Sequence, residues 1–159
     1  MTKEELKLKI EELAAEGAVK VLPFGDDLGG AEWLNVSIEA VDWLPLAQQL
    51  RVNAELDFDF LFSITAVDWK THITMVYHLR SLKHGHIIVV KAKCDRAKTE
   101  IDSVCKIWKT AELNEREAYD LMGVVFLNHP DLRRLFLTDD WEGWPLRKDY
   151  VDEINIIKL

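Results

Sequence analysis

The chain has 159 residues, of which 48% are hydrophobic and 30% are charged, as expected for one globular domain with a single core. Its formal net charge of −8 comes from 28 acidic and 20 basic residues that are scattered among one another. Phosphate groups are bound by clustered Lys and Arg, so this distribution argues against a nucleic-acid partner and against direct binding to anionic lipid.

Targeting features are not apparent in the sequence. No apolar run approaches the roughly 18–20 residues that span a bilayer, and the N-terminus has neither the basic start nor the apolar stretch of a signal peptide. We therefore expect the chain to stay in the cytoplasm. The two cysteines, Cys94 and Cys105, are far from any C-x-x-C spacing, and we interpret them as reduced, buried thiols.

The first predicted element is a helix of about four turns that begins at Thr2 and stops at Gly17. Thr2 and Glu5 have the spacing of a capping box, in which the two side chains bond to each other's backbone N–H groups. One face of this helix is apolar and carries Leu6, Ile10 and Leu13. We expect such a helix to pack on the rest of the domain through this apolar face alone.

A β-hairpin and a second helix are predicted next. Residues 18–24 and 32–40 have the composition of strands, and three glycines in 25–30 indicate the turn that joins them. Asp42 is placed to cap the following helix, where Pro45 is tolerated because the first turn needs no backbone donor. The apolar face of that helix is formed by Leu46, Ala47 and Leu50.

Three further strands follow along the chain. Residues 58–64 alternate between apolar and polar side chains, which predicts one strongly buried face that includes Phe58, Phe60, Phe62 and Ile64. Residues 73–79 repeat the pattern with Ile73, Met75, Tyr77 and Leu79, and residues 87–94 are apolar on both sides in their first half. Short links between these strands indicate an antiparallel meander.

Residues 98–109 have apolar positions at helical spacing, which predicts a third helix. A fourth helix is predicted from Glu115 to Met122, capped by Asn114 with Glu117 reaching back, and ended by Gly123. The resulting fold class is α+β, with helices packed on an antiparallel sheet. We expect residues 1–127 to form the globular part of this domain and residues 128–159 to form an extended, partner-binding C-terminal segment.

The C-terminal segment has no helical or strand period after Leu137. Residues 138–150 combine two tryptophans, Trp141 and Trp144, with glycine, proline and a cluster of charged residues. Large aromatic residues beside arginine are typical of protein interfaces, because they bring a large contact area and forked hydrogen bonding. This composition therefore predicts a surface for another protein.

An ordered set of motifs resembles the 30-kDa subunit family of respiratory complex I, the proton-pumping NADH:quinone oxidoreductase that bacteria also contain. The set comprises Glu115-Arg116-Glu117, Tyr119-Asp120-Leu121, Gly123, residues 129–134, Asp140-Trp141-Glu142-Gly143 and residues 145–150. Residues 58–61 and 65–69 also resemble that family. Two positions depart from its pattern: Trp144 stands where a His is more usual, and Val151 follows Tyr150 in place of a Pro.

The resemblance implies a cofactor-free subunit in the peripheral arm of a proton-translocating NADH:quinone oxidoreductase, on the cytoplasmic side of the cell membrane. The chain would be part of that enzyme without a catalytic site of its own, reaching the membrane only through the complex. Iron–sulfur clusters, FMN and quinone would be held by partner subunits, and the chief partner would be the large quinone-site subunit.

The residues expected to contact partners come from the motifs of the resemblance. They are Glu115, Arg116, Glu117, Tyr119, Asp120, His129, Arg133, Arg134, Trp141, Trp144, Arg147, Lys148, Asp149 and Tyr150. In this hypothesis, residues 128–150 drape over the neighbour, the basic side chains pair with its carboxylates, and Phe136 and the tryptophans fill apolar pockets. We expect no catalytic, cofactor-binding or metal-binding residues in this chain.

Catalysis within the chain is an alternative hypothesis. Carboxylates at Glu112, Glu115, Glu117 and Asp120 would allow acid–base chemistry, and a free-standing hydrolase would use Glu117, Asp120 and His129. Acidic residues also gather at helix starts because the helix dipole favours them there. Arg116 and Asp120, four positions apart, predict a local ion pair instead of a reactive group.

Metal or cofactor binding has weak support. His84 with His86, or His72 with His78, offers only two ligands, whereas zinc takes three or four, and two cysteines are too few for an iron–sulfur cluster. No G-x-G-x-x-G or Walker motif is present. Equivalent subunits of membrane-bound hydrogenases, formate hydrogenlyases and the photosynthetic-type dehydrogenase remain the closest alternatives to the complex I hypothesis.

Overall fold

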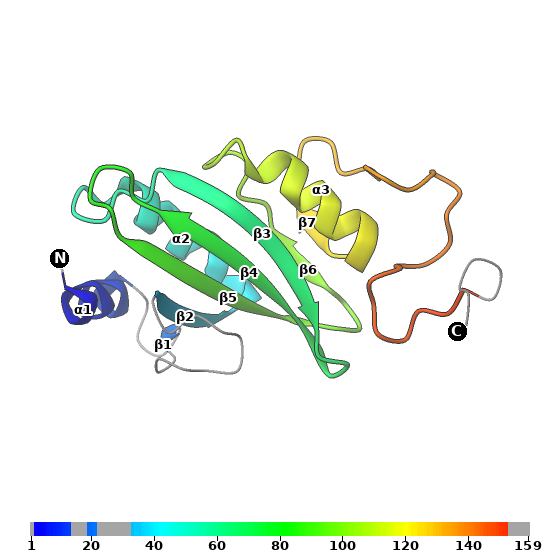
Figure 1. Ribbon diagram of the computed structural model, residues 1–159, viewed down its shortest axis with the longest axis horizontal. Coiled ribbons are helices and arrows are strands. Elements are labelled where there is room, and N and C mark those ends of the chain that lie inside the picture. Colours follow the sequence, from blue (N-terminus) through cyan, green and yellow to red (C-terminus); the bar gives the residue numbers. More distant parts are fainter. Residues whose placement is uncertain (1, 14–18, 22–32, 153–159) are drawn as a thin grey trace.

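The computed structural model describes residues 2–13, 19–21 and 33–152. Five strands form the main sheet in the order β1-β2-β5-β4-β3 (Figure 1). Their bounds are Val19–Val21 for β1, Leu34–Glu39 for β2, Phe60–Asp68 for β3, His72–Arg80 for β4 and Ile87–Asp95 for β5. A second, two-stranded sheet pairs β6 (Glu100–Asp102) with β7 (Val125–Leu127) in parallel.

The predicted strand pairing is confirmed for both hairpins of the meander and for the N-terminal hairpin. β3 pairs antiparallel with β4, β4 pairs antiparallel with β5, and β1 pairs antiparallel with β2. The parallel pairing of β2 with β5 has no counterpart in the sequence prediction. It joins the hairpin to the meander across the centre of the sheet, so the sheet is mostly but not wholly antiparallel. The α+β fold class is confirmed.

The N-terminal helices follow the sequence signals with one difference, at the start of α2. α1 (Lys3–Leu13) begins with the predicted capping box, in which the N–H of Thr2 donates to Glu5 Oε2 at 2.8 Å and the N–H of Glu5 donates to Thr2 Oγ1 at 3.2 Å. The predicted stop at Gly17 and the turn at 25–30 lie outside the described residues. α2 (Trp43–Val52) follows Asp42, which makes no side-chain capping bond because its backbone is already helical.

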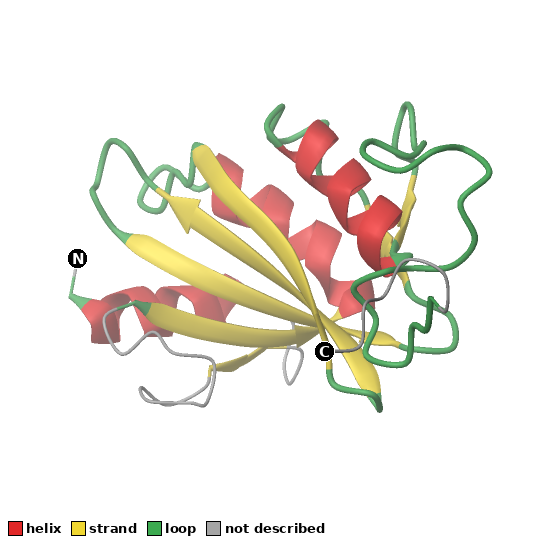
Figure 2. Cartoon of the chain, turned by 45° about the vertical axis from the view of Figure 1, so that its right-hand side comes forward, coloured by secondary structure: helices red, strands yellow, loops and turns green. Residues whose placement is uncertain are grey.

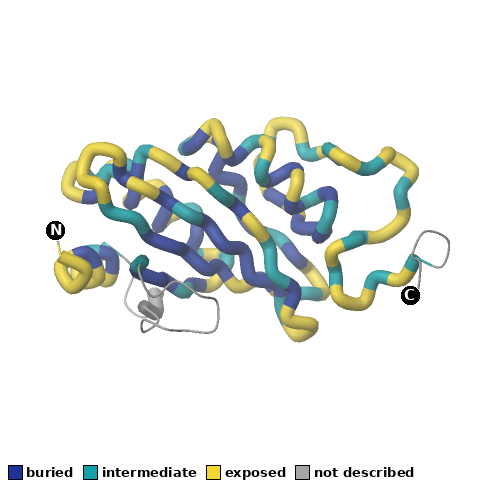
Figure 3. The backbone as a smooth tube through the Cα atoms, viewed as in Figure 1, coloured by how far each residue is buried: buried dark blue, intermediate teal, exposed yellow. Residues whose placement is uncertain are grey.

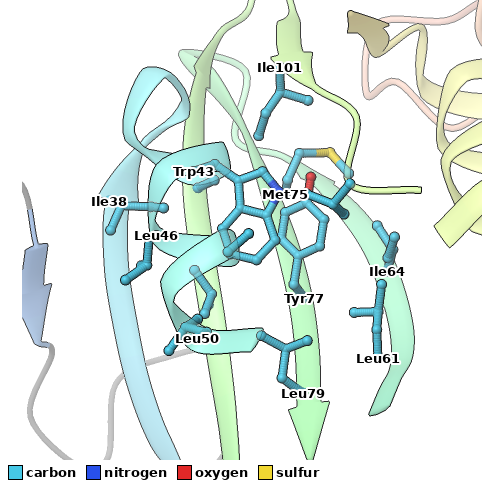
Figure 4. Packing of buried hydrophobic residues seen from close by; sticks show 14 of the residues in the cluster. Ile38, Trp43, Leu46, Leu50, Leu61, Ile64, Met75, Tyr77, Leu79 and Ile101 are labelled. Atoms are coloured by element: carbon cyan, nitrogen blue, oxygen red, sulfur yellow. The ribbon is translucent and has the colours of Figure 1, made fainter. Parts of the chain in front are cut away.

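The core packs one face of the sheet against α2, and it extends to Leu6 and Ile10 of α1 and to buried residues between 101 and 126 (Figures 2 and 3). All four predicted core residues of β4, namely Ile73, Met75, Tyr77 and Leu79, are fully buried. Trp43 of α2 lies against the Tyr77 ring, with a centroid separation of 4.2 Å (Figure 4). This pair fixes α2 on the sheet by burying two of the largest side chains in the protein.

The predicted buried face of residues 58–64 is confirmed at Phe58 and Ile64 and is wrong at Phe60 and Phe62. Phe60 and Phe62 are both 39% exposed, and Leu61 is buried in their place. The cause is a β-bulge: Leu61 pairs with Leu79 whereas Ile64 pairs with Tyr77, so an extra residue separates two positions of the same face. A strict period of two counted back from Ile64 therefore assigns Phe60 and Phe62 to the wrong side of the strand.

The predicted helix at 98–109 is also wrong. Residues 100–102 form β6, and the following residues are turns, with an isolated helical bond from the Trp108 N–H to the Val104 carbonyl at 2.9 Å. Ile101, Val104 and Trp108 are nevertheless buried. The spacing of these apolar residues reflects which positions are buried, and it does not identify the secondary structure. A strand followed by one turn buries the same positions as a helix would.

α3 (Ala111–Met122) begins earlier than predicted, with Thr110 at its N-cap position. Asn114 lies inside the helix, where its side-chain amide donates to the Thr110 carbonyl at 2.8 Å, so it is not the cap. The predicted end is confirmed, because Gly123 adopts the left-handed conformation with φ of 69°. None of the helices in the described ranges combines the length and apolar character that a bilayer crossing requires.

Candidate partner-binding site

Residues 128–152 contain neither helix nor strand and run from β7 around α3 to the end of the sheet (orange to red in Figure 1). The path is held by the chain itself. The Leu146 N–H donates to the Leu121 carbonyl at 3.0 Å, next to the end of α3. Three buried or half-buried charged side chains supply most of the remaining contacts.

Asp120 of α3 is the first anchor and is fully buried. Its Oδ2 accepts the backbone N–H groups of three successive residues, Leu135 at 2.9 Å, Phe136 at 2.6 Å and Leu137 at 3.0 Å. Burial on its own would raise the pKa of Asp120, but these three bonds and the Arg134 guanidinium outweigh it and lower the pKa. The carboxylate therefore stays ionised and clamps the loop at 135–137.

Arg134 is the second anchor. Its Nη1 donates to Asp120 Oδ1 at 2.9 Å and to the Asp120 carbonyl at 3.0 Å, while Nη2 donates to the carbonyls of Trp141 at 2.8 Å and Gly143 at 3.3 Å. The guanidinium also lies 4.8 Å from the centroid of the Trp144 ring. One side chain thus joins α3 to three parts of the segment, which uses the forked geometry that distinguishes arginine from lysine.

Arg147 is the third anchor and closes the C-terminus of α3. Its Nε donates to the Met122 carbonyl at 2.7 Å, and Nη2 donates to the Gly123 carbonyl at 3.3 Å and to Thr99 Oγ1 at 3.4 Å. A cation at this position satisfies carbonyl groups that the helix leaves open and complements the helix dipole. Partial burial lowers the pKa of Arg147 from its usual value.

Trp144 packs directly on the helix end. An added Cβ at Gly123 would lie 2.5 Å from the Trp144 ring, and the ring meets Tyr119 edge-on with a centroid separation of 5.5 Å. Gly123 is therefore required both for its left-handed backbone and for the close approach of the indole. The departure from the family pattern at Trp144 produces a contact within the chain.

A second clamp lies at the far end of the segment, and the sequence prediction does not include it. Asp68, at the end of β3, is bound by Arg96 through two 2.9 Å bonds and accepts the Lys148 N–H at 3.0 Å. Arg96 also bonds Asp149 at 2.6 Å. The Arg96 guanidinium outweighs burial and holds the pKa of Asp68 far below its ordinary value. Only the stretch 65–69 of the family resemblance signals this position.

The predicted ion pair between Arg116 and Asp120 is not formed. Arg116 is buried and donates to the carbonyls of Arg133 at 3.2 Å and Arg134 at 3.0 Å, with Asp131 at 4.0 Å. Asp120 pairs with Arg134 instead. Both side chains turn toward the segment because it passes over this face of α3. The prediction from helical spacing takes into account only neighbours within the helix.

Glu115 is fully buried, and the hydrogen bonds to its carboxylate come from neutral groups. Its Oε1 accepts the Val104 N–H at 2.8 Å and its Oε2 accepts the Ser103 hydroxyl at 2.6 Å. Burial raises its pKa to about 7, against the effect of these two bonds. Atoms of Cys105, Glu115 and His129 that are able to bind a metal lie within 4.8 Å of one another.

His129 is committed to hydrogen bonds within the chain. The Asp131 N–H donates to Nδ1 at 3.0 Å, which requires the proton to be on Nε2, and Nε2 lies 3.0 Å from the Glu112 carbonyl. The ring is thus a neutral donor to Glu112. A metal bound here would have to replace this bond and those of Glu115, so the cluster is arranged for structure.

The residues predicted for partner contact fall into two sets. The polar groups of the first set are used within the chain, and this set comprises Glu115, Arg116, Asp120, His129, Arg134 and Arg147. The second set is half-buried or exposed, and it comprises Glu117, Tyr119, Arg133, Trp141, Trp144, Lys148, Asp149 and Tyr150. The first set shapes the segment, and the second retains surface.

The alternative chemistries gain no support from this arrangement. Asp120 has its carboxylate filled by hydrogen bonds and His129 has both ring nitrogens occupied, so two members of the hypothetical acid–base trio are already engaged within the chain, and the third, Glu117, is exposed. The rings of His84 and His86 are stacked with a centroid separation of 5.4 Å, and each forms a hydrogen bond with a backbone carbonyl. Cys94 is a buried free thiol whose pKa is raised to about 12 by burial.

Comparisons with known proteins agree with the resemblance seen in the motifs. A family model described as "Respiratory-chain NADH dehydrogenase, 30 Kd subunit" matches residues 36–154. An NADH-quinone oxidoreductase subunit from Geotalea uraniireducens is 38% identical over 146 residues, covering 90% of this chain and 84% of that protein. An NADH-quinone oxidoreductase subunit from Phocaeicola vulgatus, which carries the double designation C/D, is 46% identical over 70% of this chain and is matched over only 22% of its own length.

Two solved structures share the fold. A chain of the membrane-bound sulfane sulfur reductase, described as an archaeal respiratory membrane complex, has a TM-score of 0.72 and 29% identity, covering 95% of this chain and 86% of that one. A trypsin-resistant fragment (1-134) of Nqo5 has a TM-score of 0.64 and 25% identity, covering 82% of this chain and all of the fragment.

Proposed function

The chain belongs to the family of the respiratory-chain NADH dehydrogenase 30-kDa subunit, and from this premise we propose that it is a cofactor-free, peripheral-arm subunit of an NADH:quinone oxidoreductase. Its role is to position neighbouring subunits while they carry electrons from NADH to quinone. The complex holds the chain at the cytoplasmic side of the membrane. The chief partner is the large subunit that forms the quinone site.

The observation that carries this proposal is the long segment at 128–152, which is held in one path without regular secondary structure. The side chains of Asp120, Arg134 and Arg147 form hydrogen bonds with backbone groups of the segment and of the helix end. A loop fixed in this way can dock on a partner with little further loss of conformational entropy. Its shape suits a positioning role.

Relatives with the double designation C/D support the choice of partner. Their name combines two subunit letters in one polypeptide, and the matched region is 22% of the Phocaeicola vulgatus protein. Subunits that function in one chain are expected to be neighbours when they are separate. The cofactor-free character is supported by the two cysteines of the sequence, because an iron–sulfur cluster needs about four thiolates.

The proposal is tested by purification through a tag on the N-terminus, from membranes of the native host solubilised in mild detergent. We expect other polypeptides to co-purify, to contain iron and flavin, and to oxidise NADH with a quinone acceptor. The chain purified alone is expected to contain neither iron nor flavin. Recovery of the chain without any companion, or of metal or flavin bound to the chain itself, would refute the proposal.

The likeness to the sulfane sulfur reductase chain favours a second candidate, the equivalent subunit of a related respiratory membrane complex. The same purification separates the two candidates by the electron donor that the complex accepts. Oxidation of NADH favours the first candidate. A co-purified complex that ignores NADH and reacts with hydrogen, formate or a sulfur compound favours the second.

A further inference from the structure

We propose that Phe136 is the central anchor of the surface by which this chain docks on its partner subunit, and that the partner presents an apolar pocket rimmed by Arg and Lys side chains. The inference rests on the proposed function, since it requires the chain to be a subunit. The sequence hypothesis already assigns Phe136 to an apolar pocket but expects basic residues of this chain to pair with carboxylates of the partner, whereas here Phe136 is central and the partner supplies the basic groups. Three observations carry it.

The first observation is that the backbone around Phe136 is fixed from inside. Its N–H, together with those of Leu135 and Leu137, points at the buried Asp120 carboxylate. Arg134 immediately precedes this loop and is tied to α3 and to the turn at 141–143. The loop therefore has its binding shape before any partner arrives, and less conformational entropy is lost on docking.

The second observation is the exposure of the Phe136 side chain. It is 64% exposed, whereas its neighbours Leu135 and Leu137 are half-buried. A large aromatic ring held in water on a rigid loop has the character of an interface hot spot, since its burial against a pocket yields much contact area for little ordering.

The third observation is the charge around the ring. The basic groups of this loop are already paired, Arg134 with Asp120 at 2.9 Å and Arg133 with Asp131 at 2.9 Å. A turn closed by the Trp141 N–H and the Thr138 carbonyl at 3.1 Å then presents three exposed acids, Asp139, Asp140 and Glu142. In the stretch of chain that follows Phe136 the excess exposed charge is thus negative, and a complementary partner surface is basic.

The test uses the full-length chain, tagged at its N-terminus, in the detergent-solubilised complex. Phe136→Ala is expected to lower the amount of partner recovered per tagged chain about tenfold, the effect of losing a hot-spot side chain. Leu82→Ala is the matched control, because Leu82 is 61% exposed on a different turn, and it is expected to leave recovery unchanged. The melting temperatures of both isolated variants should equal that of the wild type, since neither side chain is in the core.

A double variant, Asp139→Asn with Asp140→Asn, tests the charge. It is expected to weaken recovery several-fold at low salt and to reduce the dependence of recovery on salt concentration. Full recovery of the partner by Phe136→Ala would overturn this inference and leave the proposed function intact. An unchanged salt dependence in the double variant would overturn the basic rim. Failure of the wild type itself to recover a partner would remove the proposed function, and this inference with it.

Discussion

At the scale of single residues, buried charges are placed where the chain needs to hold irregular backbone. Asp120 binds three consecutive N–H groups and Asp68 binds a fourth from Lys148, and each carboxylate is paired with an arginine. A loop without helix or strand leaves its backbone groups unpaired. Ionised side chains are strong partners for such groups, provided that their charge is balanced.

Asp120→Asn is expected to destabilise the protein strongly. The amide keeps the size of the side chain but places an NH₂ group against backbone donors and leaves Arg134 without its counter-charge. Breaking a buried pair in this way costs about 3–5 kcal/mol of unfolding free energy. Urea denaturation measures the loss, and Asp139→Asn, at an exposed position, is the control that should change stability by less than about 0.5 kcal/mol.

Glu115 predicts a pH dependence of opposite sign to that of Asp120. Because its pKa is raised from 4.5 to about 7, the folded protein binds a proton that the unfolded chain releases. Its contribution to stability is therefore complete below pH 4.5 and is lost as the pH rises through 7. The loss amounts to roughly 3 kcal/mol of unfolding free energy at about 1.4 kcal/mol for each pKa unit.

The measurement is urea denaturation across this pH range for the wild type and Glu115→Gln. The difference between the two proteins should grow with pH in favour of the variant. Comparison within one protein is not sufficient, because burial lowers the pKa values of His78 and His86, whose contributions are lost as the pH falls. A pH-independent difference would contradict the assignment to Glu115.

The site is only partly predictable at this scale. Helical spacing pairs Arg116 with Asp120, since a helix in isolation offers no other partner. The actual partner of Asp120 is Arg134, and it becomes a neighbour only after the segment has turned back over α3. Motif resemblance identifies both residues, but no local rule assigns them to each other.

At the scale of elements, the end of α3 is the point where sequence rules and tertiary contacts agree. Glycine readily adopts the left-handed conformation that ends helices, so Gly123 is predicted to end α3, and it does so with φ of 69°. Arg147 then supplies a cation to the last carbonyls, and Trp144 covers the glycine. The helix thus ends where the segment returns to it.

Gly123→Ala is expected to cost about 1 kcal/mol for the left-handed backbone and roughly a further 1–3 kcal/mol for displacement of the Trp144 ring. Gly85→Ala is a close control, because Gly85 has a similar φ of 77° but nothing within 4 Å of an added Cβ. The difference between the two variants in urea denaturation isolates the ring contact. Equal losses would show that Trp144 moves aside freely.

Other elements show why local patterns fail. The strands of the meander are predictable because their core residues alternate without interruption in β4. The bulge in β3 breaks this alternation at a point that no residue type marks, so a strict alternation wrongly turns Phe60 and Phe62 inward. At residues 98–109 the apolar residues do recur at helical spacing, which predicts a helix. A strand and a turn bury these positions instead.

At the scale of the whole molecule, the segment and the globular part stabilise each other. The division of the sequence into a globular part at 1–127 and a partner-binding segment at 128–159 implies that truncation after Asn128 leaves a folded monomer unable to enter the complex. The contacts change this expectation. Without the segment, Asp120 loses Arg134 and three backbone donors, and Asp68 loses the Lys148 N–H.

The truncated chain is therefore expected to be less stable than the full chain by several kcal/mol, as for removal of one partner of a buried ion pair. A double-mutant cycle provides the sharper measurement. Asp120→Asn should cost much less in the truncated chain than in the full chain, because its partners have already gone. Equal costs in the two backgrounds would show that the segment contributes nothing to Asp120.

The parallel pairing of β2 with β5 has a consequence for how the chain reaches this state. Val36 lies beside Val90, so the central ladder closes a loop of roughly fifty residues, whereas the neighbouring β4–β5 hairpin, which pairs Arg80 with Ile87, closes over six. Folding should therefore wait on a late, long-range step that follows formation of the β3–β4–β5 meander. During synthesis, the N-terminal hairpin leaves the ribosome well before the strand that completes its sheet has been made.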